Sequence, residues 1–283
     1  TKEDGRIHTS FNQQGTVTGR LSSSEPNLQN IPVKGELGKR IRDCFVSENG
    51  FKLVSFDYSQ VELRAAALIS GDKKMTEAFR EGKDIHTITA SEIFNTPLKS
   101  VTSDMRRKAK VINFGILYGM GVNSISENLK IPKKEAEEYK NEYFKDFEGI
   151  AEYITNIIEE ARANGFVKTL FGRKRRFDEI YSGNSFAARE AERMAINMPI
   201  QGTSADIIKI AMVKIDEFLE KNKLEEKARM LLQIHDELLF EIKDEFLEDA
   251  VEIIKSIMEG VAKPYSPEIP FPVEVKIGKS WVK

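Results

Sequence analysis

The hydrophobic pattern along the chain changes from polar segments to strand-like runs and then to helical ones. Residues 1–33 are rich in Ser, Thr, Asn, Gln and Gly and show little helical periodicity, which predicts short strands and polar loop. The stretch FKLVSFDYSQ at 51–60 opens as a short apolar run typical of a strand, and VELRAAALIS at 61–70 has the composition of a helix. Asp57 is therefore expected at the end of a strand, just before a helix.

The remainder of the chain combines long helical stretches with a few strands. Pro199 and Gly202 are expected to separate two helices, with Thr203 or Ser204 as the cap of the second. A last strand is expected in PVEVKIGKSWV, at 272–282. Mainly helical segments are expected at 72–160, 186–198, 203–221 and 244–262. The pattern predicts an α+β fold, in which a small sheet carries a mostly helical insertion.

A charged triplet interrupts the apolar run MLLQIHDELLFEI at 230–242. Because a buried charge without a partner is costly, His235, Asp236 and Glu237 should either bind a positive group or lie where the run reaches water. The segments on both sides have strand character, so we expect a tight antiparallel hairpin with Asp236 at its tip. For His235 alone, an ordinary histidine at a turn remains an alternative.

Asp57 and Asp236 are then acids at the ends of two strands. If these strands are neighbours, the two carboxylates converge and suit Mg²⁺, which is typically held by one or two carboxylates together with substrate phosphates. Two such ions roughly 3.5–4 Å apart can support an in-line phosphoryl displacement. Spacing alone leaves open the alternative that Asp57 only caps the helix that follows it.

A second pattern lies in RRKAKVINFGILYG at 106–119. Arg106, Lys110, Phe114 and Tyr118 recur every four residues, so a helix places them in one slowly drifting stripe. The stripe passes from two cations to two aromatic rings, which matches the polarity of a nucleoside triphosphate. The alternative is a common amphipathic helix with its aromatic residues in the core and its cations in water.

Composition narrows the class of protein without fixing its function. The chain is 40% hydrophobic and 31% charged, and no apolar stretch approaches the ~20 residues that span a bilayer. Cys44 is the single cysteine, which excludes an internal disulfide and favours a reducing compartment. The net charge of −2 hides basic runs at 39–42, 106–110 and 172–176. Each run alone is explained by a solvated face, but the three together favour a phosphate-rich partner.

At this point the chain resembles a known family, the family A DNA polymerases of the bacterial DNA polymerase I type. The resemblance covers nearly the whole chain and rests on blocks in the family's order. These blocks are TGRLSSSEPNLQNIP (18–32), DYSQVELR (57–64), DIHTITA (84–90), RRKAKVINFGILYG (106–119), MPIQGTSADIIK (198–209) and HDE (235–237). The short HDE block alone would be unspecific, whereas the long blocks in series are very specific.

The resemblance implies a right-hand polymerase fold. Residues 1–71 and 187–283 would form the palm, a small antiparallel sheet with helices, and residues 72–186 a mainly helical fingers subdomain. The family's thumb and the first part of its palm would precede Thr1 and are absent from this chain, so we expect weak binding of primer–template by the chain alone.

The resemblance also implies an activity, which is template-directed transfer of deoxynucleotides to a primer 3′-OH with release of pyrophosphate. This reaction would serve DNA replication or repair. The implied location is the cytoplasm of a bacterium, at the nucleoid, or an organelle.

The resemblance also implies roles for individual residues. Two Mg²⁺ ions, with Mn²⁺ as an alternative, would be held by Asp57, Asp236 and the backbone carbonyl of Tyr58. Lys110 would also act as the general acid for pyrophosphate, and Glu237 would be a catalytic acid in a peripheral or indirect role. Glu62, with Tyr118 beside it, would exclude a ribose 2′-OH. The implied nucleotide-binding residues are Gln60, Glu62, His86, Arg106, Lys110, Phe114 and Tyr118. The implied primer–template residues are Arg20, Asn27, Gln29, Asn30, Arg193, Asn197, Gln201 and His235.

Three other functions compete with a DNA polymerase. One is a catalytically silent nucleotide- or DNA-binding module that lacks the thumb, and primer extension would separate it from an enzyme. A single-subunit RNA polymerase is opposed by Glu62, and a metal-dependent nuclease would not need the stripe from Arg106 to Tyr118. Phe114 stands where some members of the family carry Tyr, which implies discrimination against dideoxynucleotides.

Overall fold

The computed structural model describes residues 3–32 and 35–281, so the ends of the segments predicted at 1–33 and 272–282 lie partly outside the described residues. The contacts divide the chain into two compact units. Unit 1 comprises Thr1–Val61, Ser204–Tyr265 and Phe271–Lys283, and unit 2 comprises Glu62–Thr203 and Ser266–Pro270. The predicted boundaries of palm and fingers, at 71/72 and 186/187, stay a prediction because these units are defined by contacts alone.

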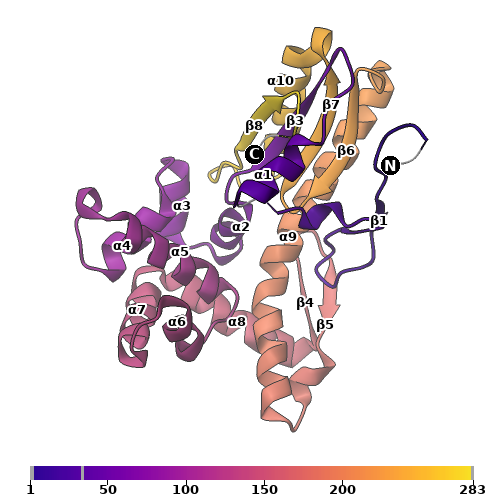
Figure 1. Cartoon of the computed structure of the whole chain (residues 1–283). Helices are drawn as coiled ribbons and strands as arrows, with labels where there is room; N and C mark the ends of the chain where they lie inside the picture. Colours follow the sequence, from indigo (N-terminus) through magenta and orange to yellow (C-terminus); the bar gives the residue numbers. More distant parts are fainter. Residues whose placement is uncertain (1–2, 33–34, 282–283) are drawn as a thin grey trace. The chain divides into compact units, whose positions relative to one another are not determined.

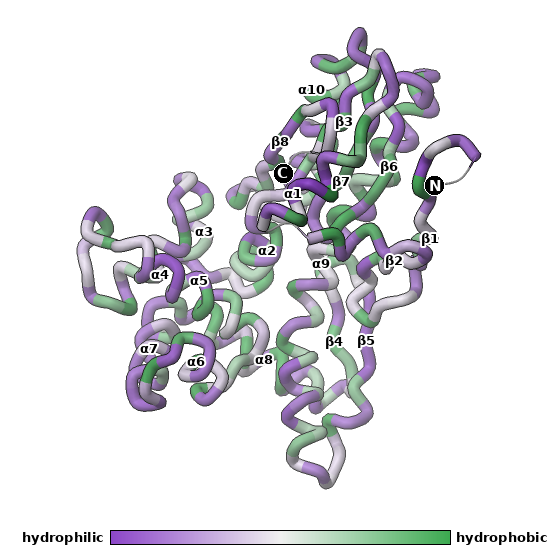
Figure 2. The backbone as a smooth tube through the Cα atoms, in the orientation of Figure 1, coloured by the Kyte–Doolittle hydropathy of each residue, from purple (hydrophilic) through white to green (hydrophobic). Residues whose placement is uncertain are grey.

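Unit 1 is built on a four-stranded antiparallel sheet with the order β6-β7-β3-β8 (Figure 1). The two inner strands, β3 and β7, are buried on both faces, and each combines apolar residues with a few buried polar ones (Figure 2). The strands of unit 1 are β1 (Ser10–Asn12), β2 (Ser22–Ser24), β3 (Phe51–Tyr58), β6 (Ala228–Ile234), β7 (Glu237–Lys243) and β8 (Val273–Gly278). Its helices are η1 (Leu28–Asn30), α1 (Gly35–Asp43), η4 (Asp244–Phe246) and α10 (Leu247–Gly260).

The two faces of this sheet have different partners. On one face, Phe56 and Phe240 are fully buried and meet edge to face at 5.6 Å, and α10 packs against β7 and β8. On the other face, Leu53, Leu239 and Trp281 form a second buried cluster. Residues paired across antiparallel strands project to the same face, so Asp57 and its partner Glu237 lie on the side of Trp281.

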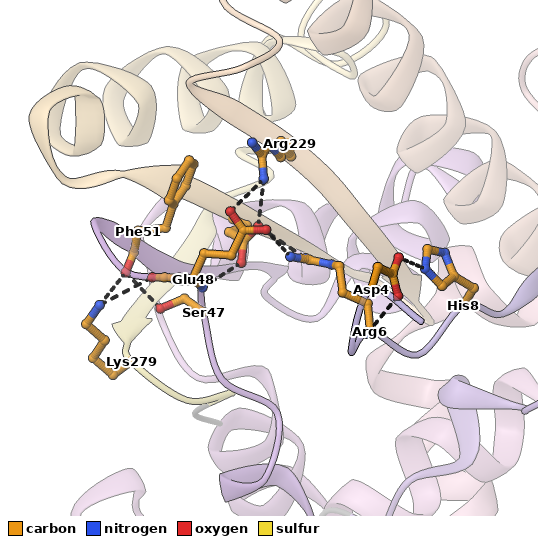
Figure 3. A network of polar contacts seen from close by, with 9 residues as sticks. Asp4, Arg6, His8, Ser47, Glu48, Phe51, Arg229 and Lys279 are labelled. Carbon is orange, nitrogen blue, oxygen red and sulfur yellow. Dashed lines mark hydrogen bonds and ion pairs between the residues drawn. The ribbon is translucent and has the colours of Figure 1, made fainter. Parts of the chain in front are cut away.

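A network of charges ties the N-terminal segment to the sheet of unit 1 (Figure 3). The carboxylate of Glu241 on β7 is fully buried and accepts hydrogen bonds from Arg6 at 3.1 Å, Arg229 at 3.4 Å and the backbone N–H of Glu48 at 3.0 Å. Both arginines also reach the Glu48 carboxylate, at 2.7 and 3.2 Å. A buried carboxylate needs such partners, so replacing either arginine would leave part of this charge uncompensated.

Unit 2 is mainly helical. Side chains fix several of its helix starts, because Asp72, Asp84 and Thr102 each accept a hydrogen bond from a backbone N–H of the first turn that follows. The helices are α2 (Val61–Ser70), α3 (Lys73–Arg80), α4 (Ile85–Ile93), η2 (Leu98–Ser100), α5 (Ser103–Leu117), α6 (Val122–Leu129), α7 (Lys133–Asp146), α8 (Glu148–Asn164) and η3 (Asp178–Tyr181). The strands β4 (Phe166–Lys168) and β5 (Lys174–Arg176) pair as a small hairpin.

The predicted α+β fold is confirmed, but one predicted helix break is wrong. A single helix, α9 (Ser185–Asn222), runs through Pro199 and Gly202, and the boundary between the two units falls within it. Proline removes one helical hydrogen bond, and both residues here are buried, so tertiary packing outweighs their local preference to end a helix. Thr203 and Ser204 are consequently buried helical residues rather than caps.

None of the helices within the described residues combines the length and the apolar character that crossing a membrane requires.

Candidate active site

The hairpin of β6 and β7 brings Asp236 next to Asp57. β6 ends at Ile234 and β7 begins at Glu237, so His235 and Asp236 form the turn, as predicted. β3 lies beside β7 in a register that pairs Asp57 with Glu237, and the backbone N–H of Tyr58 donates to the carbonyl oxygen of Asp236 at 3.1 Å. Two acids almost 180 residues apart in sequence are therefore held side by side by the backbone of the sheet.

Asp57 belongs to the sheet and does not cap the helix that follows. It lies within β3, whereas α2 begins at Val61, which makes Gln60 the residue at the cap position. Gln60 has a φ of 54°, a conformation that residues other than glycine seldom adopt. The next residue of β3, Tyr58, is buried and donates its hydroxyl to the carbonyl of Met258 at 2.7 Å. Only the backbone of Tyr58 is then available to ligate a metal.

Glu237 has different surroundings from Asp57 and Asp236. It is 1% exposed, and its Oε1 atom accepts from Ser55 Oγ at 2.6 Å and from Trp281 Nε1 at 3.3 Å. The guanidinium of Arg42 lies over the Trp281 ring, 4.1 Å from its centroid. These contacts hold Glu237 inside the sheet, and they favour an indirect role over direct metal ligation.

The donor set of the acid pair fits a magnesium site. No group of three or more His, Cys, Asp and Glu side chains in residues 3–32 and 35–281 could hold a metal by itself. Mg²⁺ does not need such a cage, because it keeps several waters and takes one or two carboxylates plus phosphate oxygens. Asp57 and Asp236 are both partly exposed, and with the Tyr58 carbonyl they supply hard oxygen ligands.

Several predicted DNA-binding residues of unit 1 lie around the Asp236 turn. Arg20 lies 3.8 Å from the Asp236 carboxylate, and His235 is exposed with a φ of 54°. The amide of Gln29 donates to the Gln233 side chain at 3.0 Å, and Gln233 in turn donates to the carbonyl oxygen of His235 at 2.5 Å. Asn27 and Asn30 are exposed at the two ends of the η1 segment, where Asn27 caps that turn.

The predicted stripe of unit 2 lies on α5. Arg106 and Lys110 are exposed, whereas Phe114 and Tyr118 are half-buried, with stacked rings whose centroids are 6.1 Å apart. The core of this helix is formed by other residues, among them Ile112 and Ile116. The aromatic residues of the stripe are therefore not simply core residues, which argues against the plain amphipathic alternative.

Glu62 and Tyr118 are joined by a hydrogen bond. Glu62 is only 6% exposed, and the Tyr118 hydroxyl donates to its Oε2 atom at 2.5 Å. This contact links the start of α2 to the end of α5, two segments that are 56 residues apart in sequence. It also directs a carboxylate and a phenol toward one another at the aromatic end of the stripe.

His86 lies on α4 beside the cationic end of the stripe. Burial lowers the pKa of its imidazole to about 4, and the cations Arg106 and Lys110 add to this effect while Asp84 opposes it. Asp84 itself binds Arg106 through two contacts of 2.5 and 3.3 Å. Although burial acts in the opposite direction, these hydrogen bonds hold the pKa of Asp84 below its usual range.

The remaining predicted DNA-binding residues share one face of α9. Arg193, Asn197 and Gln201 are four residues apart, so they follow one another along the helix. Within the described part of the chain, the buried Oδ1 atom of Asn197 has no hydrogen-bond partner. Gly119, with a φ of 68°, has no space for a side chain, because a Cβ atom there would lie 2.9 Å from the Arg193 side chain. The backbone at Gly119 and the Arg193 side chain therefore approach each other closely.

Sequence reasoning missed the side chains that hold these groups in position. Gln233 fixes the turn at His235, and Asn113, which is fully buried, contacts both His86 and Thr89. A polar residue within an apolar strand or on the buried face of a helix was the available signal in both cases. Asp84 falls inside the segment predicted as mainly helical at 72–160, and nothing local indicated its contact with Arg106.

The family model described as DNA polymerase family A matches residues 1–283. DNA polymerase I, thermostable, of Thermus aquaticus is 50% identical over 278 residues, which are 98% of this chain and 33% of that protein. DNA polymerase I of Pseudomonas aeruginosa is 45% identical over 277 residues, 98% of this chain and 30% of that protein.

A solved structure gives the same result at the level of the fold. The POL domain of Pol1 from M. smegmatis, in complex with DNA primer-template and dNTP, matches with a TM-score of 0.94 and 42% identity. The match covers 99% of this chain and 49% of that chain. This chain spans about a third of the length of the curated relatives above. With its ordered motifs and its sheet of neighbouring acids, the chain belongs to DNA polymerase family A.

Proposed function

We propose that this chain carries out template-directed DNA synthesis, adding deoxynucleotides to a primer 3′-OH and releasing pyrophosphate. The observation that carries the proposal is the register of β3 and β7, which places Asp57 and Asp236 side by side at one end of the sheet. The relative from M. smegmatis, solved with primer-template and dNTP, supports the same substrates here.

The acid pair has the role of metal ligand in this proposal. Asp57, Asp236 and the Tyr58 carbonyl would hold two Mg²⁺ ions, or Mn²⁺ in their place. When bound, the metal supplies charge stabilisation for the phosphoryl group and activation of the attacking hydroxyl. Glu237 acts indirectly, because its contacts with Ser55 and Trp281 keep it in the sheet next to Asp57.

The stripe on α5 has the role of nucleotide binding. Arg106 and Lys110 bind the triphosphate through charge-assisted hydrogen bonds, and His86 provides a further contact beside them. Lys110 holds a proton at Nζ that it can donate to the pyrophosphate as it leaves. Phe114 and Tyr118 offer aromatic surface to the sugar and base, and Gln60 adds a polar contact.

Sugar selection is assigned to the hydrogen-bonded pair at the end of the stripe. Tyr118 holds the Glu62 carboxylate through the 2.5 Å contact, so that this buried acid excludes a ribose 2′-OH. Phe114 lacks the hydroxyl of a tyrosine, and we expect the chain to discriminate against dideoxynucleotides. Equal incorporation of both nucleotide types would contradict this expectation.

Two groups of residues are assigned to the primer–template. Donors such as Arg and Gln can test the shape of a base pair in the minor groove, where the acceptors of all pairs are nearly alike. In unit 1 the group is Arg20, Asn27, Gln29, Asn30 and His235, and in unit 2 it is Arg193, Asn197 and Gln201.

Primer extension with purified protein tests the proposal against a silent binding module. We expect Mg²⁺-dependent extension that falls roughly 10³-fold or more in Asp57→Ala and in Asp236→Ala, because several kcal/mol of transition-state stabilisation are lost. Asp216→Ala, at an exposed position of α9, is the matched control and should keep full activity. DNA binding without any extension by the wild-type chain would identify a binding module instead.

A further inference from the structure

A buried chain of hydrogen bonds leads from the backbone of α4 to the imidazole of His86. Thr89 and Asn113 are both fully buried, and the Asn113 amide nitrogen lies 3.0 Å from His86 Nδ1 and 3.0 Å from Thr89 Oγ1. The Thr89 hydroxyl also lies 2.8 Å from the carbonyl oxygen of Ile85, one turn earlier in the same helix. All four residues belong to unit 2.

The direction of these hydrogen bonds follows from the Ile85 carbonyl, where the series of hydrogen bonds begins. The Ile85 carbonyl can only accept, so the single proton of the Thr89 hydroxyl is used there and a lone pair faces Asn113. That lone pair requires an amide N–H from Asn113, which agrees with the shorter of the two contacts, 3.0 Å against 3.2 Å to the amide oxygen. The second N–H of the same amide then points at Nδ1 of His86.

We propose that Asn113 is a positioning residue, which binds Nδ1 of His86 as an acceptor and so keeps the ring proton on Nε2, facing a triphosphate oxygen. A neutral imidazole carries one ring proton, so a donor at Nδ1 leaves the proton to Nε2. The other tautomer would present a lone pair to an anionic ligand. The contact with the triphosphate rests on the function proposed above, whereas the tautomer of the ring does not.

Three further observations support this assignment. Burial and the cations Arg106 and Lys110 lower the pKa of His86 to about 4 against the opposing effect of Asp84, so the ring is neutral near pH 7. Within residues 3–32 and 35–281 we find no hydrogen-bond partner for Nε2, which leaves this donor for a ligand. His86 is 2% exposed, and one side of its ring meets Phe114 at a centroid distance of 5.8 Å, which fixes the plane of the ring.

The tautomer can be measured in the 283-residue chain without nucleotide or DNA. Nitrogen-15 NMR of the imidazole rings distinguishes protonated from unprotonated nitrogens, and the chain has only three histidines. A His86→Gln variant identifies the His86 signals. We expect Nε2–H at pH 7 in the wild type and a proton on Nδ1 in Asn113→Asp, because a carboxylate there can only accept. Asn128→Asp, at an exposed position of α6, is the control and should leave the His86 signals unchanged.

Nucleotide use provides the second measurement. In single-nucleotide primer extension, we expect Asn113→Asp to raise the KM for dATP roughly tenfold, as for the loss of one charge-assisted hydrogen bond, without changing DNA affinity. Thr89→Val should shift the tautomer in the same direction, and Thr89→Ser should restore the wild-type signals. This threonine pair keeps the test decisive if Asn113→Asp does not fold.

The outcomes separate this inference from the proposed function. A wild-type ring with its proton on Nδ1, or an Nε2–H ring that is unchanged in both Asn113→Asp and Thr89→Val, would overturn the inference. A shifted tautomer with an unchanged KM would also overturn it, because His86 would then have no donor role at the triphosphate. Absence of primer extension by the wild-type chain would count against the polymerase function, while the NMR result would still decide the tautomer.

Discussion

The acid pair of unit 1 and the stripe of unit 2 are built in opposite ways. Asp57 and Asp236 are brought together by strand pairing between segments almost 180 residues apart, and a backbone hydrogen bond at Tyr58 fixes their register. The stripe from Arg106 to Tyr118 lies on one helix, where the spacing of four residues alone aligns the side chains. The acid pair therefore depends on the integrity of a sheet, and the stripe depends mainly on local helix geometry.

This difference also appears in the energetics of the two sites. A one-residue slip of β7 against β3 would turn the apolar side chains of β7 to the other face of the sheet. The hydrophobic core therefore fixes the register of these strands, and this register keeps the acid pair together. The cations of α5 are exposed and need no such core, but the contact of Arg106 with Asp84 is worth less because water screens it. We therefore expect core mutations to damage the first site and surface mutations to damage the second.

The largest expected effect comes from Phe240→Ala. Phe240 is fully buried against Phe56, so its truncation should lower the free energy of unfolding of unit 1 by about 3–5 kcal/mol. Denaturant unfolding followed by Trp281 fluorescence measures this loss. The His86 signals in unit 2 should stay unchanged under native conditions, and their movement would show that the two units do not respond separately. Phe186→Ala, at a residue that is 70% exposed, is the control.

A smaller effect is expected from Lys110→Ala. Loss of a charge-assisted hydrogen bond should cost ~1.5–3 kcal/mol of nucleotide binding, which corresponds to a rise of roughly 10- to 100-fold in the KM for the nucleotide. DNA affinity, measured by fluorescence anisotropy, should change far less. Arg107→Ala, on the same helix with its side chain 59% exposed, should leave the KM unchanged. An equal loss of nucleotide use and DNA binding would contradict the role given to Lys110.

A still smaller loss is expected from Tyr118→Phe. The substitution removes the hydroxyl that donates to Glu62, so we expect a loss of about 1 kcal/mol of stability and weaker discrimination against ribonucleotides. Competition between a ribonucleotide and the matching deoxynucleotide measures the second effect. Tyr139→Phe removes a similar contact to Glu135 within a single helix and should leave sugar discrimination intact. Unchanged discrimination in Tyr118→Phe would show that Glu62 is held by its other contacts.

The smallest effect concerns pH. His86 has a folded-state pKa of about 4 against an ordinary value of 6.5, so the unfolded chain takes up its proton first. The contribution of neutral His86 to stability is therefore complete above pH 6.5, and it decreases as the pH falls from 6.5 to 4. NMR titration should show the His86 ring changing near pH 4. Titration of His86 near 6.5 would contradict the burial of this ring.

The sequence determined the local features of both sites. The strand that ends near Asp57, the hairpin around Asp236 and the helix from Arg106 onward follow from apolar runs and periodicity, because side chains repeat every two residues in strands and every 3.6 in helices. The sequence also determined the resemblance, since the blocks lie in family order. The helix break predicted at Pro199 was wrong, because burial of α9 outweighed the local tendency of proline to end a helix.

Only the tertiary structure decided which strands are neighbours and which polar side chains support the site. The pairing of β3 with β7 depends on contacts across the whole chain, and no local pattern encodes it. The same holds for Asn113, which looks like any polar residue in a helix until α4 packs against α5 and presents His86 Nδ1 to its amide. Periodicity acts within a segment, whereas convergence of distant groups is a property of packing, and the chemistry proposed for this protein depends on that convergence.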